Sequence, residues 1–274
     1  MARQEIDLTT PQPNGKMGEP TKSAWEKVND MTLEIYDSID TVQDKSFISG
    51  LLLFWSSGTS LAISSGAAYV EGVGNVYLNS DLSKSLPGLT ANSWYHLYLY
   101  DNAGTADVEA STTNPSTNTF GSARTKSGDT SRRYIGSFRT TTGGAIVQFQ
   151  HLITAGKITY LGAAYSVRNV LTGGMAASTT TVSLANLLPI FASSADILIT
   201  NGATAGAVVT GSSIQALPLA AGATNSYFGY VDPSKGLSVS THPVDTSRAM
   251  QYRYLSTPTG AGLYMEVNGY TFSR

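Results

Sequence analysis

The residues best suited to acid–base chemistry or metal binding near neutral pH are the three histidines, His96, His151 and His242. They lie far apart in the sequence, which contains no H-E-x-x-H, G-x-S-x-G or G-x-x-x-x-G-K-S/T motif. Isolated histidines of this kind are typical of packing or turn positions. The sequence therefore predicts no metal site and no bound cofactor.

Carboxylates are the next candidates, because a glycosidase needs two of them facing the bond that it cleaves. Asp107, Glu109 and Asp129 fall near the ends of predicted strands. The plainer interpretation is that Asp129 opens a turn and that Glu109 lies on the solvent face of a strand. A β-helix that cleaves polysaccharide also needs greater length and a fixed repeat, which this sequence lacks. We therefore predict that the protein is not an enzyme and has no catalytic residues.

Aromatic side chains could instead bind a sugar by stacking against its ring. The candidates are Trp94, Tyr95, Tyr98, Tyr100, Tyr134, Tyr227, Phe228 and Tyr230. Aromatic residues on a central strand more often pack in the core, and we favour that interpretation. Arg132 and Arg133 could bind an acidic glycan or a phosphate, but a local ion pair with Asp129 or a covering of apolar surface is more usual. None of these residues is assigned to a site.

The composition limits the possible partners. Charged residues make up 13% of the 274 residues and the net charge is −2, so long-range attraction for nucleic acid is not expected. The chain has no cysteine, which excludes disulfides and thiolate metal sites. The first residues lack the apolar region of a secretory signal, and the apolar run at 48–55 is broken by Ser49 and Gly50. We expect synthesis in the cytoplasm, a soluble product and no membrane insertion.

Most of the chain is expected to be β-structure, because β-branched and aromatic residues recur at period two between turns rich in Gly, Ser and Asn. The clearest strand is 94–100, followed by a turn at 101–104 and a returning strand at 106–110. The expected strands are 51–56, 60–64, 68–71, 75–78, 94–100, 106–110, 132–138, 145–153, 180–184, 196–200, 207–209, 226–231, 237–240, 250–255 and 263–271. A change of composition at 167–174 predicts a boundary between two β-sandwich-like domains, residues 46–168 and 169–274.

One amphipathic helix is expected, at 23–42, with Ser23 and Glu26 as a capping box. Trp25, Val28, Thr32, Ile35, Ile39 and Val42 follow the alternating spacing of three and four that forms a coiled-coil seam. So short a helix is not stable alone, and the sequence offers no second helix to cover the seam. We therefore expect a helical self-association neck at 23–45, preceded by an extended, partner-binding segment at 1–22.

Two groups of residues resemble bacteriophage tail-fibre and baseplate-attached virion proteins. The first group is IDLTTP (6–11), NG (14–15), PTKSAWEKVN (20–29) and EIY (34–36). The second group is WYHLYLY (94–100), VEAS (108–111) and DTSRRYIGS (129–137). Together they cover about the first half of the chain.

The resemblance implies a homotrimeric structural component of the virion tail, made in the host cytoplasm. Residues 1–22 would bind other tail or baseplate proteins, and the distal β-domain would recognise a host-surface glycan or pilus. The alternative is a purely structural connector, or a head-surface fibre or decoration protein, without receptor contact. The seam residues alone do not fix the number of copies.

Overall fold

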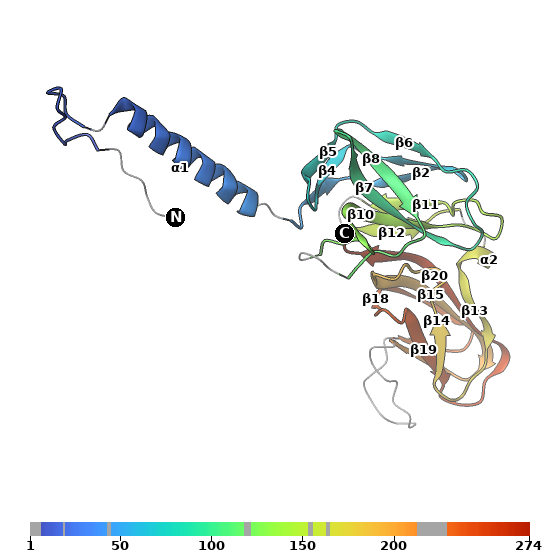
Figure 1. Cartoon of the computed structure of the whole chain (residues 1–274). Helices are drawn as coiled ribbons and strands as arrows, with labels where there is room; N and C mark the ends of the chain where they lie inside the picture. The colour runs from blue at the N-terminus through green and yellow to red at the C-terminus, as the bar shows by residue number, and fades with distance from the viewer. Residues whose placement is uncertain are drawn as a thin grey trace. The chain divides into compact units, whose positions relative to one another are not determined.

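The computed structural model describes residues 7–18, 20–42, 45–117, 122–152, 156–162, 165–212 and 229–274 (Figure 1). The chain divides into two compact units, Met1–Asp44 and Lys45–Arg274. The first unit contains helix α1 (Thr21–Val42), and the second is mostly β-structure. The mostly β fold predicted from the sequence is confirmed.

The N-terminal unit begins with a tight loop where an extended segment was expected. The Asp7 carboxylate accepts hydrogen bonds from the backbone N–H groups of Thr9 and Thr10, at 2.8 and 3.1 Å. The Thr10 side chain, together with these backbone bonds, lowers the pKa of Asp7 to about 2. The chain then reverses around Gly15, and the N–H of Gly18 donates back to the carbonyl of Thr10 at 2.8 Å. An Asx turn and a glycine with positive φ thus close this segment on itself.

Helix α1 begins two residues before the predicted start. The carbonyl of Pro20 accepts the first helical hydrogen bond, from the N–H of Ala24 at 3.1 Å, so Ser23 lies inside the first turn and does not cap the helix. The polar seam position is satisfied locally, because the Thr32 hydroxyl donates to the carbonyl of Val28 at 2.8 Å. The side chains of the later seam positions, Ile35, Ile39 and Val42, lie outside the described residues.

The described residues of the second unit form four antiparallel sheets. The largest has the strand order β18-β15-β20-β12-β11-β2-β3-β6, with β13 also paired to β20; the others are β1-β4-β5, β8-β7-β10-β9 and β14-β19-β16-β17. The first strands are β1 (Ile48–Gly50), β2 (Leu53–Ser57), β3 (Ser60–Ile63), β4 (Gly66–Val70), β5 (Gly74–Leu78), β6 (Leu82–Ser85), β7 (Trp94–Asn102), β8 (Thr105–Ser111), β9 (Thr125–Lys126), β10 (Asp129–Arg139), β11 (Phe149–Leu152) and β12 (Lys157–Tyr160). A short helix α2 (Tyr165–Arg168) follows, and the remaining strands are β13 (Asn169–Gly174), β14 (Thr180–Ser183), β15 (Ala192–Ala205), β16 (Val208–Ser212), β17 (Gly229–Val231), β18 (Lys235–Pro243), β19 (Ala249–Tyr254) and β20 (Thr259–Phe272).

The predicted boundary at residue 168 falls inside this unit. Residues 167–174, where the boundary was predicted, include β13, which pairs with β20. Strand β20 also pairs with β12, which comes before the predicted boundary. Strands from both expected domains, 46–168 and 169–274, therefore share the largest sheet. The two regions form one compact unit because their strands hydrogen-bond to each other.

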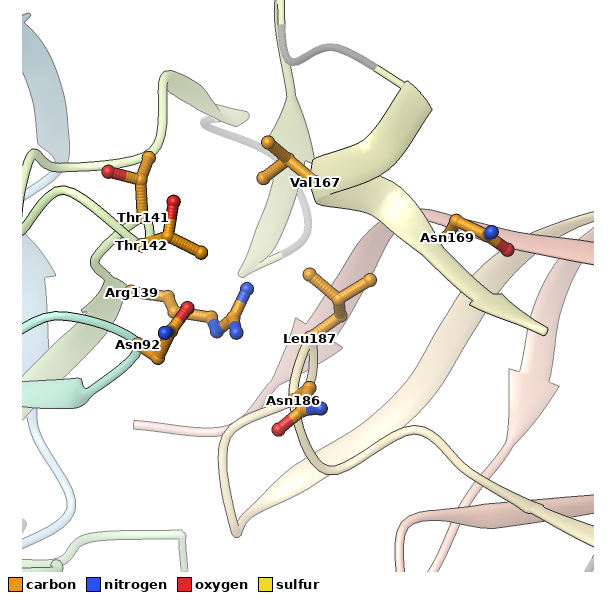
Figure 2. Close-up of a pocket in the computed structure, with 8 residues that line it drawn as sticks. All are labelled: Asn92, Arg139, Thr141, Thr142, Val167, Asn169, Asn186 and Leu187. Carbon is orange, nitrogen blue, oxygen red and sulfur yellow. The ribbon is translucent and has the colours of Figure 1, made fainter. Parts of the chain in front are cut away.

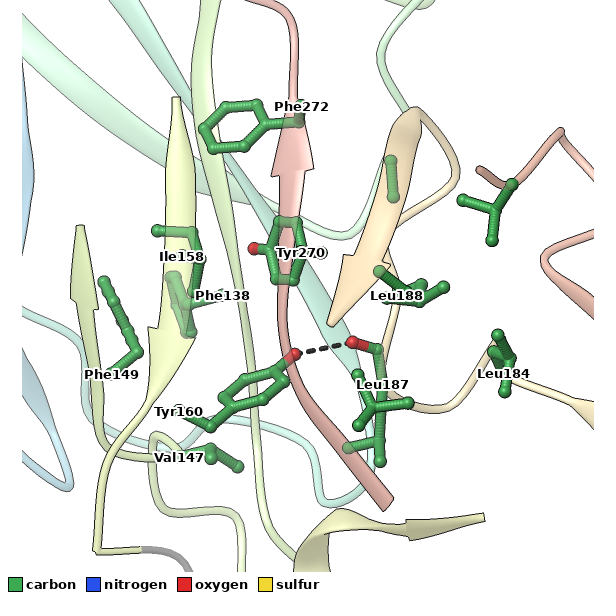
Figure 3. Close-up of a cluster of buried hydrophobic side chains, with 14 of the residues drawn as sticks. Phe138, Val147, Phe149, Ile158, Tyr160, Leu184, Leu187, Leu188, Tyr270 and Phe272 are labelled. Carbon is green, nitrogen blue, oxygen red and sulfur yellow. Dashed lines mark hydrogen bonds between the residues drawn. The ribbon is translucent and has the colours of Figure 1, made fainter. Parts of the chain in front are cut away.

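The core is continuous across the same boundary. One buried cluster includes Leu53 and Leu97 from the first region and Leu188 and Met265 from the second. Figure 3 shows Tyr270 and Phe272 of β20 beside Phe138, Phe149 and Ile158. The last strand thus packs against the earlier half of the chain.

The turn predicted at residues 101–104 is confirmed. Ala103 and Gly104 have φ values of 52° and 87°, and the N–H of Gly104 donates to the Asp101 carboxylate at 3.0 Å. Two consecutive positive φ values match the right-handed twist of a two-residue hairpin. Strands β7 and β8 pair in register on either side of this turn.

Replacing Phe272 by Ala should lower the free energy of unfolding by about 3–5 kcal/mol, because it removes a buried ring from the core. The Phe272 ring lies 5.7 Å from the His151 ring and 6.1 Å from the Tyr134 ring, centroid to centroid. Chemical denaturation followed by hydrogen exchange should show that peptides from both sides of residue 168 lose protection together. Thr271→Ala, on the partly exposed face of the same strand, is the matched control. Separate transitions for the two regions would contradict a single unit.

Candidate functional site

The three histidines are buried and lie apart. His96 is 1%, His151 is 2% and His242 is 1% exposed, and burial lowers the pKa of each to about 4. The Nδ1 atom of His151 accepts a hydrogen bond from the backbone N–H of Leu53 at 3.1 Å. These histidines are neutral at pH 7 and fill the interior, in agreement with the packing role predicted for them.

His96 belongs to a buried chain of polar groups that has the residue types of a hydrolytic triad. Its Nδ1 lies 2.7 Å from the Ser137 hydroxyl and its Nε2 lies 3.1 Å from the Asn114 side-chain oxygen. The Tyr134 hydroxyl lies 2.8 Å from the same Ser137 oxygen. Ser137 is 1% exposed, so no substrate can reach it. These hydrogen bonds satisfy buried polar groups and hold β10 against β7.

The carboxylates considered for glycosidase chemistry are paired with cations. Glu109 accepts a hydrogen bond from the Lys126 ammonium and another from Arg132 Nε at 3.0 Å. Asp107 accepts one from Lys84 Nζ at 2.8 Å and one from the Tyr100 hydroxyl at 3.1 Å. Burial acts to raise the pKa of Asp107, but these hydrogen bonds bring it below its ordinary value. Asp107 is therefore a poor proton donor for a glycosidase.

Asp129 opens a turn as predicted, and its carboxylate accepts hydrogen bonds from the hydroxyl and N–H of Ser131 at 2.6 and 3.1 Å. These hydrogen bonds lower the pKa of Asp129. Arg132 lies 4.0 Å from this carboxylate, and its guanidinium stacks 4.0 Å from the centre of the Tyr100 ring. Arg133 is buried and donates to the carbonyl of Ser46 at 3.2 Å. Neither arginine offers an open anion site.

The aromatic residues of β7 and β10 belong mainly to the core. Tyr98 and Tyr134 are 0% and 1% exposed, and Tyr95 is stacked on Phe138 with the ring centres 5.4 Å apart. Trp94 is partly buried, and its indole N–H donates to the carbonyl of Ala185 at 3.0 Å. Tyr230 is 47% exposed, whereas the predicted candidates Tyr227 and Phe228 lie outside the described residues. Tyr95, Tyr98 and Tyr134 therefore give no stacking platform for a sugar.

A polar pocket that the sequence did not reveal lies between the two halves of the β-unit. It has a volume of about 360 Å³ and is lined by Asn92, Arg139, Thr141, Thr142, Val167, Asn169, Asn186 and Leu187. Figure 2 shows the Arg139 side chain extending toward Leu187, with Asn92 and Asn186 beside it. This pocket lies at the small end of the range of about 300–1,000 Å³ that is usual for ligand sites.

Hydrogen bonds hold both walls of the pocket in place. On one wall, the Tyr160 hydroxyl donates to the carbonyl of Leu187 at 2.7 Å (Figure 3). The indole N–H of Trp94 donates to the carbonyl of Ala185, two residues earlier. On the other wall, the N–H of Asn92 donates to the carbonyl of Thr141 at 2.9 Å. The N–H of Ala145 donates in turn to the Thr141 hydroxyl at 3.2 Å. Such walls keep the pocket open without a ligand.

Arg139 is positioned by its strand. It is the last residue of β10 and pairs directly with Trp94 of β7. It is 9% exposed, and burial lowers its pKa. Its Nε atom is buried and has no hydrogen-bond partner among the described residues. No sequence motif marks Arg139, because its significance depends on the lack of a partner in the folded chain.

A second hollow, of about 380 Å³, is lined by residues 77–82 and the turn at 104–106. Its one charged lining residue is Asp81, which already accepts a hydrogen bond from the N–H of Ser65 at 2.8 Å. Tyr77, which also lines it, is 58% exposed. The Arg139 pocket is therefore the better candidate for a binding site.

Lowering the pH from about 7 to about 5 should reduce the melting temperature through the histidines. The unfolded chain binds a proton at each histidine near pH 6.5, whereas the folded chain does so only near pH 4, so acid favours unfolding between these values. His96→Gln should make the melting temperature less dependent on pH in this window, as measured by circular dichroism. Asp107→Asn should leave that dependence unchanged, because its carboxyl titrates at lower pH. An unchanged slope in His96→Gln would disprove the assignment.

No protein-family model, no curated protein and no solved structure matches the chain. In the part of the chain that the structure describes, no three His, Asp or Glu side chains come together as a metal site. No helix there has both the length and the apolar character needed to cross a membrane. The candidate site therefore depends on its own geometry: a preformed polar pocket with one buried cation.

Proposed function

We propose that the protein is a structural component of a bacteriophage tail, as a tail fibre or baseplate-attached protein. The N-terminal unit binds other tail proteins and self-associates as a trimer, and the β-unit recognises a molecule on the host surface. The resemblance of the N-terminal and β7–β10 residues to tail-fibre proteins is the source of this proposal. The observation that carries it is the uncovered apolar surface of the N-terminal unit.

Four large apolar side chains of this unit are exposed: Leu8 by 74%, and Met17, Trp25 and Leu33 by 63% each. A unit of 44 residues buries too little surface to leave such side chains in water without a stability cost. Contacts with other copies and with a docking protein would cover them. Trp25 lies on the predicted seam, whereas Leu33 lies beside it, so both kinds of contact are needed.

The β-unit favours binding over catalysis. Its histidines are buried, and Asp107 and Glu109 are held by cations. The Arg139 pocket offers hydrogen-bonding groups but places no nucleophile beside a base among its lining residues. A rigid β-framework carrying such a pocket suits recognition of a host-surface molecule.

Removal of residues 1–44 should convert a trimer into a monomer, because the remaining unit has its own continuous core. Light scattering after size exclusion measures both masses. In the full chain, Val28→Asp should also dissociate the trimer, since a charge on the seam cannot be buried without a partner. Asn29→Asp, one residue off the seam and exposed, is the matched control. A monomeric full chain would refute self-association through α1.

Electron microscopy of virions labelled with an antibody against the β-unit tests the location. We expect label at the distal tail or at the baseplate. Label on the head, or only between the tail and a separate fibre, would instead select the connector or decoration protein without receptor contact.

A further inference from the structure

We infer that the Arg139 pocket binds the carboxylate of an acidic sugar, such as a uronic acid unit of a host-surface polysaccharide. This inference rests on the proposed function only in taking the host surface as the source of the sugar. The site itself follows from four features of the pocket: an arginine whose buried Nε has no partner among the described residues, no second charged residue in the lining, a polar rim and preformed walls.

Arg139 differs from other arginines of the described β-unit in the contacts of its terminal nitrogens, although Arg124, Arg168 and Arg248 also have a buried Nε atom without a hydrogen-bond partner. Arg124, Arg133, Arg248 and Arg274 each donate to a backbone carbonyl, of Ser116, Ser46, Leu188 and Leu51 respectively. Arg168 donates to Asn268 at 2.7 Å and lies 3.3 Å from Glu266. No hydrogen bond or ion pair between described residues holds the Arg139 side chain, although the residue is 9% exposed and its Nε atom is buried. Its position is therefore not explained by a structural contact of its polar atoms.

The buried Nε–H of Arg139 destabilises the folded protein, because its hydration is lost and no described residue replaces it. An anion in the pocket would supply what is missing. A carboxylate matches the planar guanidinium with two parallel hydrogen bonds. Arg139 is the one charged residue among those that line the pocket, so the local charge suits an anion of charge −1 better than a phosphate dianion.

The rest of the lining suits a sugar ring. Asn92, Asn186 and Thr142 are exposed at the rim and carry both donors and acceptors for hydroxyl groups. Val167, which is partly exposed, supplies apolar surface for the C–H face of a ring. Figure 2 shows these groups on different sides of Arg139, from segments before residue 143 and after residue 166. A ligand could therefore contact both halves of the β-unit at once.

Calorimetry and saturation-transfer NMR on the full-length protein test the site with three probes: glucuronate, glucose and inorganic phosphate. We expect binding of glucuronate, and weaker or no binding of glucose, which has the same ring without the carboxylate. Arg139→Met should weaken glucuronate binding by about ten- to a hundredfold, since one charge-assisted hydrogen-bond pair is lost. Arg139→Lys should restore only part of it, because an ammonium lacks the planar fork. Arg132→Gln, in the ion-paired cluster on β10, should bind like the unaltered protein.

Two further readouts separate a binding role from a structural one. Arg139→Met should leave the melting temperature unchanged or raise it, because it removes an unpaired buried charge. Asn186→Ala, at an exposed rim position, should weaken glucuronate binding by about two- to tenfold without affecting folding. Equal binding of glucose and glucuronate, preference for phosphate, or a large fall in melting temperature for Arg139→Met would each overturn the inference. If the protein adsorbs to host cells while glucuronate does not bind, the pocket assignment fails and the proposed function stands; if neither occurs, both fail.

Discussion

Strand β20 holds the β-unit together through hydrogen bonds to three other strands, β12, β13 and β15. Its side chains also cross the core: the Tyr270 hydroxyl donates to the carbonyl of Ser137 in β10 at 3.0 Å, and Phe272 packs against Tyr134. The last residue, Arg274, donates to the carbonyl of Leu51 at 2.8 Å. Because β20 contacts nearly every layer, the two regions of the chain cannot separate without breaking buried contacts. The expected C-terminal strand is confirmed, but its partners make one unit of residues 45–274.

The same arrangement creates the Arg139 pocket. Arg139 is the last residue of strand β10 and lines one side of the pocket. Hydrogen bonds from Tyr160 and Trp94 hold the segment that contains Leu187, which also lines the pocket. Tyr160 also packs near Tyr270 of β20, with 6.1 Å between ring centres. The pocket therefore depends on long-range packing between segments that are distant in the sequence. A site built in this way is as rigid as the core beneath it.

Features set by local chemistry could be predicted from the sequence, whereas those set by distant partners could not. The turn at Ala103 and Gly104 follows from residue types that accept positive φ, and the strands beside it follow from their alternation. The change of composition at 167–174 predicted a boundary, yet these residues include strand β13, which approaches β20 closely: a Cβ on Gly262 would come within 2.7 Å of the Gly173 carbonyl carbon. The helix begins at Thr21, directly after Pro20, and not at the capping box that was predicted at Ser23. Arg139 was missed because an unpaired side chain is recognised only after folding.

Many buried polar side chains among the described residues have hydrogen-bond partners nearby. Asn201, 0% exposed, shows it well: its amide donates to the carbonyls of Gly206 and Val231, and its oxygen accepts from Tyr254. Arg139 is one of several described residues with a buried polar atom that lacks a partner, and among these it is the one that lines the Arg139 pocket. Natural proteins tolerate a buried polar atom without a partner chiefly where function requires it, because a bound ligand that pairs with this atom stabilises the folded state. A ligand that bound Arg139 in this pocket would supply the hydrogen-bond partner that its Nε lacks among the described residues.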